Sequence, residues 1–377
     1  MTDRLKELSE AGVSIWLDDL SRERLETGNL DELIRERSVV GVTTNPTIFA
    51  AALADGERYD AQVREVAQGH VEVTDSLVDE TIVALTVKDV QDACDAFTEV
   101  FEATDGVDGR VSIEVSPDLA DDTGGTLHMA KELWAAVDRP NCYIKIPAVG
   151  QSLPAITGAL AEGINVNVTL IFGLDRFRQV MQAYVDGLEQ ARSNGLDLSR
   201  IHSVASFFVS RVDTEIDKRL DDVEGGDELK GQAGVANARL AFEAFEQFFT
   251  GPQWDSLVED GARLQRPLWA STGVKNEAYR DTMYVDDLVV AGTVNTMPEK
   301  TMDAVADHSD IDGDQVHGNY PAARKVMADL ADAGISYDDV ISTLEREGVD
   351  KFVKSWHELQ DTVRDQLGRA LDSSSQS

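Results

Sequence analysis

The segments CYIKIP (Cys142–Pro147) and NVNVTLI (Asn165–Ile171) decide the fold class, because each alternates polar and apolar side chains over the length of a β-strand. In the first, isoleucines alternate with Tyr143 and Lys145. In the second, valines and a leucine alternate with asparagines and Thr169. Helices packed on a parallel sheet can cover the apolar set, so the polar set must face the other side.

Six further segments of this kind occur along the chain, separated by stretches of helical periodicity. They are Ser14–Asp18, Val39–Thr43, Val111–Val115, Ser203–Phe207, Pro267–Ser271 and Leu288–Val294. Eight strands that alternate with helices predict an α/β fold, a closed (β/α)₈ or TIM barrel. An open doubly wound sheet is the alternative, but no GxGxxG motif follows the first strand. In a barrel, the polar strand faces point inward.

The remaining sequence predicts additions to this barrel. Residues 213–265 are too many for one crossover helix, and apolar residues recur at helical spacing from Tyr337 onward. We therefore expect a single domain over residues 1–371, with extra helices at about 213–265 and 322–370 packed outside the barrel. The Ser-rich end, residues 372–377, is expected to be disordered.

The net charge of the chain excludes some partners. Among 377 residues, 34 are Lys or Arg and 70 are Asp or Glu, for a formal net charge of −36. Nucleic acid and anionic membrane surfaces are therefore not expected as partners. Adaptation to concentrated salt, which screens self-repulsion, is one explanation of the charge, and ordinary acidity of an arginine-rich composition is the other.

The cysteines and the beginning of the sequence indicate the compartment. Cys94 and Cys142 are too few for a disulfide framework and form no CxxC pair, which favours a reducing compartment. Charged residues follow the first methionine closely, with no apolar signal-peptide core, and no apolar run is long enough to span a membrane. A cytoplasmic protein is expected.

The candidate chemistry begins with Lys145, which the alternation places inside the barrel among apolar neighbours. Loss of hydration favours the neutral amine, which is a nucleophile for carbonyl carbons. Asp18 and Glu114 also lie at or near strand ends, where barrel active sites form, and can supply the proton transfers of Schiff-base chemistry. The structural alternative is a lysine that reaches solvent or pairs with Glu114.

Two other segments indicate substrate contacts. Thr43 and Asn45 belong to TTNPT (43–47) after the second strand, where capping explains Pro46 and leaves Asn45 available to contact a polyol. Near the later strands, Arg211 and the segment STGVKN (271–276) combine cations with a glycine turn, which suits a phosphate group.

No motif indicates a cofactor. The six histidines lack metal-ligand spacing, and neither GxSxG nor GxxxxGK[ST] occurs. Neither a metal ion nor a nucleotide cofactor is expected.

Several collinear motifs together resemble the transaldolases of the longer bacterial type, within the class I Schiff-base aldolase superfamily. They are SIWLDDLSRERLETGNL (14–30), GVTTNPTIF (41–49), SIEVSP (112–117), YIKIPAV (143–149), EGINVNVTLIFGLDRF (162–177), ASFFVSR (205–211), WASTGVKN (269–276) and AGTVNTMP (291–298). The match extends over nearly the whole barrel and is less specific over residues 221–265 and beyond residue 300.

This resemblance implies a cofactor-free transfer of a dihydroxyacetone unit between phosphorylated sugars in the pentose phosphate pathway. Sedoheptulose 7-phosphate and glyceraldehyde 3-phosphate would give erythrose 4-phosphate and fructose 6-phosphate. The resemblance also suggests a monomer or homodimer.

The resemblance further implies a role for each matched residue. Lys145 matches the Schiff-base lysine, and Asp18 the acid/base of carbon–carbon cleavage. Glu114, with Thr169 holding a water, matches the proton relay of imine formation. The substrate-binding positions are matched by Thr43, Asn45, Asn167, Ser206, Arg211, Ser271 and Lys275, although many members carry arginine in place of Lys275. Only one of the adjacent residues Asp18 and Asp19 can point inward.

Two alternatives stay open. The first is a simple class I aldolase of the same superfamily that releases dihydroxyacetone or uses another donor. The second is a catalytically silent sugar-phosphate binding protein on the barrel scaffold.

Overall fold

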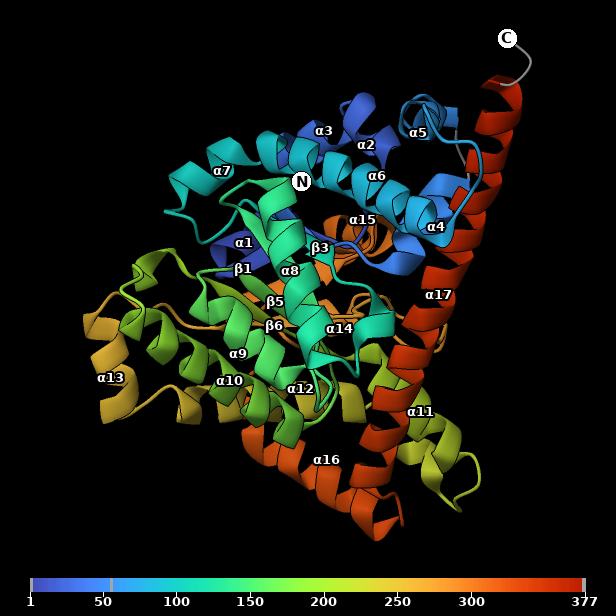
Figure 1. Ribbon diagram of the computed structural model, residues 1–377. Coiled ribbons are helices and arrows are strands. Elements are labelled where there is room, and N and C mark those ends of the chain that lie inside the picture. Colours follow the sequence, from blue (N-terminus) through green and yellow to red (C-terminus); the bar gives the residue numbers. More distant parts are fainter. Residues whose placement is uncertain (1–2, 55–56, 375–377) are drawn as a thin grey trace.

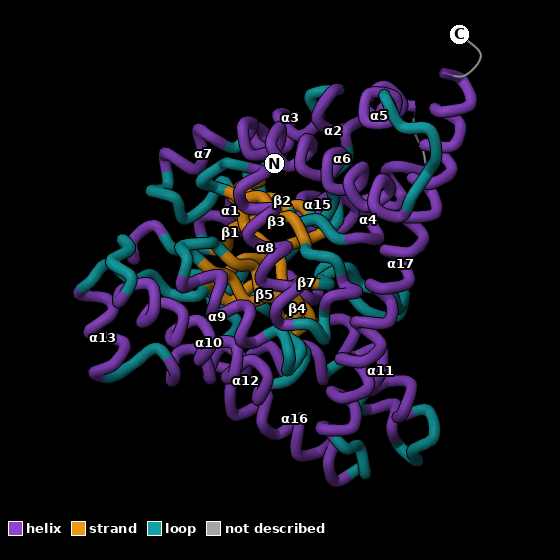
Figure 2. Tube along the Cα trace, viewed as in Figure 1, coloured by secondary structure: helices purple, strands orange, loops and turns teal. Residues whose placement is uncertain are grey.

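The computed structural model describes residues 3–54 and 57–374, and it confirms the predicted (β/α)₈ barrel. Eight parallel strands close in sequence order, each paired with its neighbour, and β1 pairs with β8. The strands lie together inside the surrounding helices (Figure 2). The strands are β1 (Val13–Leu17), β2 (Val39–Val42), β3 (Arg110–Glu114), β4 (Cys142–Pro147), β5 (Val166–Ile171), β6 (Ser203–Phe208), β7 (Arg266–Ala270) and β8 (Thr293–Met297).

Helices surround the barrel on its outside (Figure 1). In chain order they are α1 (Arg4–Glu10), α2 (Arg22–Glu26), α3 (Asn29–Glu36), α4 (Pro46–Ala54), α5 (Asp60–Ala67), α6 (Asp75–Ala96), α7 (Thr98–Ala103), α8 (Thr123–Val137), α9 (Leu153–Ala161), α10 (Leu174–Ser193), α11 (Ser210–Leu220), α12 (Ala233–Phe248), α13 (Pro252–Glu259), α14 (Met283–Asp286), α15 (Glu299–His308), α16 (Tyr320–Asp332) and α17 (Tyr337–Ser374). None of these helices is both long and apolar enough to cross a membrane.

The eighth strand does not lie where the sequence predicted it. We expected it over Leu288–Val294, but β8 begins at Thr293. The apolar residues Leu288–Val290 are buried in the core without joining the sheet, and a turn with Gly292 at φ 84° separates them from the strand. The expectation was wrong because an apolar run indicates burial without specifying strand geometry.

Large apolar side chains fill the barrel beneath the strands' C-terminal ends. Trp16 and Tyr143 are buried there, with ring centroids 6.1 Å apart. A Cβ at Gly41 would lie 2.7 Å from the Trp16 ring, so glycine is required at this position for the indole to fit. This packing confines any cavity inside the barrel to its C-terminal mouth.

The C-terminal helix also contacts side chains from the barrel interior. α17 is a single helix of 38 residues that packs along α4, α5, α6 and α11 (Figure 1). Its residues Leu344 and Phe352 are buried in one cluster with Trp16 and Tyr143. The amphipathic pattern predicted the helix correctly, but such a pattern does not specify which surface the apolar face covers.

The prediction that residues 372–377 are disordered is partly wrong. α17 continues through residues 372–374, and residues 375–377 lie outside the described part of the chain. Extending an existing helix adds a hydrogen bond for each residue fixed, so a Ser-rich end can continue a long helix. Ser373 also donates its hydroxyl to the Arg369 carbonyl at 2.7 Å.

Candidate active site

A cavity of about 220 Å³ opens at the C-terminal end of the barrel strands. Nine of the eleven residues predicted for the site line it: Asp18, Thr43, Asn45, Lys145, Thr169, Ser206, Arg211, Ser271 and Lys275. The other two, Glu114 and Asn167, contact members of this set directly. The polar strand faces identified in the sequence therefore meet at one place.

Lys145 lies at the centre of this cluster. Its side chain is 6% exposed, and its Nζ donates a hydrogen bond to the Thr44 carbonyl at 2.8 Å. Oε2 of Glu114 lies 3.4 Å from the same nitrogen. The strand register produces this pair, because Glu114 on β3 is the direct partner of Lys145 on β4. The predicted alternative, in which Lys145 pairs with Glu114, is thus realised, at the edge of the cavity that Lys145 lines.

Burial raises the pKa values of both carboxylates in the cluster. The pKa of Glu114 rises to about 7 because desolvation outweighs the attraction of Lys145. The pKa of Asp18 is raised by the same cause, although Lys145 and a hydrogen bond from Thr43 oppose it. A carboxyl group with a pKa near neutral pH, such as that of Glu114, suits acid–base catalysis.

The ambiguity between Asp18 and Asp19 is resolved by their partners. Asp18 accepts a hydrogen bond from Thr43 Oγ1 at 2.9 Å, and that hydroxyl lies 2.7 Å from Thr296 Oγ1 on β8. Asp19 instead pairs with Arg24 at 2.6 Å. Asp18 is therefore the carboxylate of the cavity.

A chain of hydrogen bonds orients the amide of Asn167. Ser206 donates to its Oδ1 at 2.7 Å, and its Nδ2 donates to Ser112 Oγ at 3.0 Å. All three side chains are buried, so this network holds the amide in one orientation. Asn167 is the register partner of Lys145, which places the amide beside the amine.

Thr169 lies next to an irregularity in β5. The pairing with β6 shifts between Val168 and Ile171, and Leu170 adopts a left-handed conformation with φ 59°. Bulges beside active sites re-aim side chains. Thr169 Oγ1 is buried and has no hydrogen-bond partner among the described residues, so it is available to a molecule in the cavity.

Asn45 has a second role that the sequence reading missed. We expected capping to explain Pro46 and to leave Asn45 available for substrate. Instead Asn45 Oδ1 accepts a hydrogen bond from the Ile48 backbone at 3.1 Å at the start of α4, and Thr44 donates its hydroxyl to the Ser112 carbonyl. Asparagine is a favoured capping residue, and the cap fixes this side chain at the cavity wall.

One end of the cavity is cationic. Arg211, Lys275 and Lys351 line it, and none forms an ion pair with any described residue. Burial lowers the pKa of Arg211, and burial and the Arg211 charge lower that of Lys275. Ser271, with φ 56° at the end of β7, adds a hydroxyl 2.8 Å from that of Ser210. In a chain with net charge −36, such a cluster is suited to bind an anion.

The sequence reading missed several members of the site. Lys351 and Phe352 come from α17, and Thr296 comes from the strand that was misplaced. Phe352 fitted the helical apolar pattern, but no sequence signal placed it near Lys145, whose Nζ lies 5.9 Å from its ring centroid. Ser112 lay on the polar face of its predicted strand, and this signal could have identified it.

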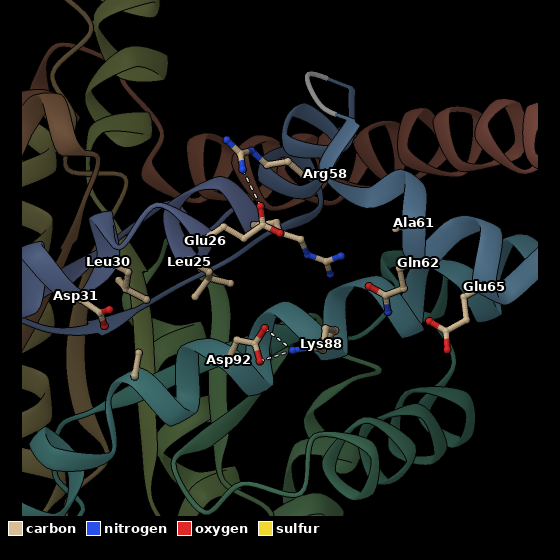
Figure 3. A pocket seen from close by; sticks show the side chains of 12 residues that line it. Leu25, Glu26, Leu30, Asp31, Arg58, Ala61, Gln62, Glu65, Lys88 and Asp92 are labelled. Carbon is tan, nitrogen blue, oxygen red and sulfur yellow. Dashed lines mark hydrogen bonds and ion pairs between the residues drawn. The ribbon is translucent and has the colours of Figure 1, made fainter.

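A larger cavity, of about 750 Å³, lies among α2, α3, α5 and α6 (Figure 3). Two ion pairs join residues that line it: Arg58 lies 2.7 Å from Glu26, and Lys88 lies 2.5 Å from Asp92. None of the eleven predicted residues lines it. Within residues 3–54 and 57–374, no group of three His, Cys, Asp or Glu side chains is placed to hold a metal ion.

Comparisons with known proteins agree with this geometry. The family model described as Transaldolase/Fructose-6-phosphate aldolase matches residues 15–363. A transaldolase of Mycolicibacterium paratuberculosis is 60% identical over 370 residues, which cover 97% of this chain and 98% of that protein. The transaldolase of Saccharopolyspora erythraea is 58% identical over 366 residues (97% and 98%), and that of Thermobifida fusca 58% identical over 369 (97% and 99%). The chain belongs to the transaldolase/fructose-6-phosphate aldolase family.

Proposed function

We propose that this protein is a transaldolase of the pentose phosphate pathway, which transfers a dihydroxyacetone unit between a ketose phosphate and an aldose phosphate. The donor and acceptor pairs are sedoheptulose 7-phosphate with glyceraldehyde 3-phosphate, and fructose 6-phosphate with erythrose 4-phosphate. The observation that carries the proposal is a buried amine, Lys145, next to Asp18 and Glu114 in a cavity whose other end is cationic.

The first step in this proposal is formation of a Schiff base. The neutral amine of Lys145 attacks the ketose C2 carbonyl, and loss of water gives an imine. Glu114, 3.4 Å from the amine, relays the protons through a water held by Thr169. Its raised pKa supports this role, because a group that titrates near 7 can both accept and donate a proton near neutral pH.

The second step breaks the C3–C4 bond. Asp18 takes the proton of the C4 hydroxyl, the aldose phosphate leaves, and the electron pair of the bond forms an enamine on Lys145. Asn167, Ser206, Asn45 and Thr43 hold the three-carbon unit until an acceptor aldehyde enters. Addition to that aldehyde, with Asp18 returning its proton, reverses the sequence.

The sugar phosphate is held at the cationic end of the cavity. Arg211 can form paired hydrogen bonds to phosphate oxygens, and Lys275 supplies a point charge. The hydroxyl of Ser271 adds a donor beside them.

The family description also includes fructose-6-phosphate aldolases, so release of free dihydroxyacetone is the competing activity. An assay with fructose 6-phosphate separates the two, run with and without erythrose 4-phosphate. A transferase releases about one equivalent of glyceraldehyde 3-phosphate per site without an acceptor and turns over when acceptor is added. Continuous turnover without acceptor would indicate an aldolase, and absence of any reaction would indicate a silent binding protein.

The same proposal includes a cytoplasmic location and a monomeric or homodimeric state. Cys94 and Cys142 are both buried free thiols, which supports a reducing compartment. Light scattering during size-exclusion chromatography tests the oligomeric state: a mass of about 41 or 82 kDa agrees with it, given 41.2 kDa for the chain.

A further inference from the structure

The C-terminal helix, α17, packs directly over the cavity. Phe352 is 4% exposed and its ring centroid lies 5.9 Å from Lys145 Nζ. One turn later, Ser355 Oγ lies 2.7 Å from Oγ1 of Thr47, the last residue of the TTNPT segment. One turn earlier, a Cβ at Gly348 would lie 3.3 Å from Leu170 Cδ2, so the helix backbone approaches the β5 irregularity closely.

These contacts fix the position of Lys351, the residue before Phe352. Lys351 lines the cavity together with Arg211 and Lys275, although nearly 140 residues separate it from Arg211 in sequence. It has no ion-pair partner among the described residues. Lys354, on the same helix, differs in both respects: it does not line the cavity, and it lies 3.9 Å from Glu358.

The three cations repel one another. Lys351 is an exposed residue, and its pKa is lowered by partial desolvation and by the charge of Arg211. Desolvation and the charges of Arg211 and Lys351 lower the pKa of Lys275. Asp18 in the same cavity attracts Arg211, but no described carboxylate forms an ion pair with any of the three cations. An anion between them would therefore relieve their repulsion.

We propose that Lys351 is a third cationic ligand of the substrate phosphate, supplied by the C-terminal helix, and that it increases the preference for phosphorylated over unphosphorylated sugars. This inference rests on the proposed transaldolase function. A lysine ammonium suits the role, because a flexible point charge at the cavity mouth can follow a phosphate as it enters and leaves.

The test compares Lys351→Gln with the matched control Lys354→Gln, which removes the same charge from the same helix. We expect Lys351→Gln to raise the KM for fructose 6-phosphate about tenfold, the effect of losing one charge-assisted contact. The inhibition constant of inorganic phosphate should rise by a similar factor, with kcat nearly unchanged. Lys351→Arg should restore most of the affinity, and Lys354→Gln should behave as wild type.

A substrate without phosphate provides the specificity readout. The rate at which borohydride traps an adduct with free dihydroxyacetone should be the same in Lys351→Gln and wild type. Equal KM values in the two glutamine variants would overturn the inference, as would equal losses with dihydroxyacetone and fructose 6-phosphate.

The failure of the proposed function can be recognised separately. If the wild type neither turns over nor traps any sugar, the transaldolase assignment fails, and calorimetry with inorganic phosphate still tests Lys351. Weaker phosphate binding by Lys351→Gln than by Lys354→Gln would support the anion site, and equal binding would overturn it.

Discussion

The carboxylate of Glu114 and the amine of Lys145 lie 3.4 Å apart at the same level of neighbouring strands, with side chains only 5% and 6% exposed. Apart from this ion pair, Glu114 Oε2 has no hydrogen-bond partner among the described residues. Burial therefore outweighs the attraction of Lys145, and the pKa of Glu114 rises to about 7.

This raised pKa predicts a pH-dependent stability. The unfolded chain loses the Glu114 proton near pH 4.5, whereas the native state keeps it until about pH 7. Between these values the native state binds more protons, so this contribution to stability is lost as pH rises and changes little above about pH 7. From pH 5 to pH 8, the Tm of Glu114→Gln should therefore rise by a few degrees relative to the Tm of the wild type. A Tm difference between the variant and the wild type that does not change with pH would contradict this prediction.

The position of Asp18 predicts at which step the reaction stops when its carboxylate is removed. Asp18→Asn leaves Lys145 and Glu114 in place, so the Schiff base still forms, but the C4 hydroxyl proton has no acceptor. Turnover should fall about 10²–10⁴-fold. Mass spectrometry after borohydride treatment with fructose 6-phosphate should find the whole six-carbon sugar phosphate on the variant and a three-carbon unit on the wild type. A three-carbon adduct formed at the wild-type rate would exclude this role for Asp18.

Because Gly348 lies close to Leu170 and Phe172, we predict that activity requires α17 to stay packed against the barrel. Gly348→Leu would place a large side chain against Leu170 and Phe172 and push the helix away from the barrel mouth. We expect a loss of about 1–3 kcal/mol in stability and a higher KM for fructose 6-phosphate.

Gly368 is the matched control on the same helix, because nothing lies within 4 Å of a Cβ added there. Gly368→Ala should raise stability by about 0.5–1 kcal/mol through helix propensity, with kinetic constants unchanged. If the kinetic constants of Gly348→Leu were also unchanged, the packing of α17 against the barrel would not matter for activity.

The net charge of −36 predicts that added salt stabilises the fold. The Debye length falls from about 10 Å at 0.1 M to about 3 Å at 1 M salt, which screens repulsion among the excess carboxylates. Thermal scans should show Tm rising with KCl over this range. A Tm that stays constant or falls would favour ordinary acidity over salt adaptation.

The barrel and most of the cavity residues were predictable from the sequence, because strand alternation reports which side chains face inward. Lys145, Asn167 and Thr169 share the polar faces of their segments. The register places Lys145 and Asn167 at one level, and Thr169 lies two residues farther along β5. The same alternation predicted the first and last residues of β1 to β7 to within about one residue.

The remaining features depend on tertiary packing, which local periodicity does not encode. Leu288–Val290 are apolar because they are buried, and nothing in their pattern reveals that they stay outside the sheet. Lys351 looks like any exposed lysine of an amphipathic helix until the contacts of Phe352 and Gly348 fix which side of that helix meets the barrel.

The central claim is that Lys145 forms the covalent intermediate. It is tested most directly by intact-protein mass after incubation with fructose 6-phosphate, with and without borohydride, on wild type and Lys145→Ala. We predict a reduced three-carbon adduct on the wild type alone, mapped to Lys145. An adduct that persists in Lys145→Ala, or no adduct on the folded wild type, would contradict the proposed mechanism.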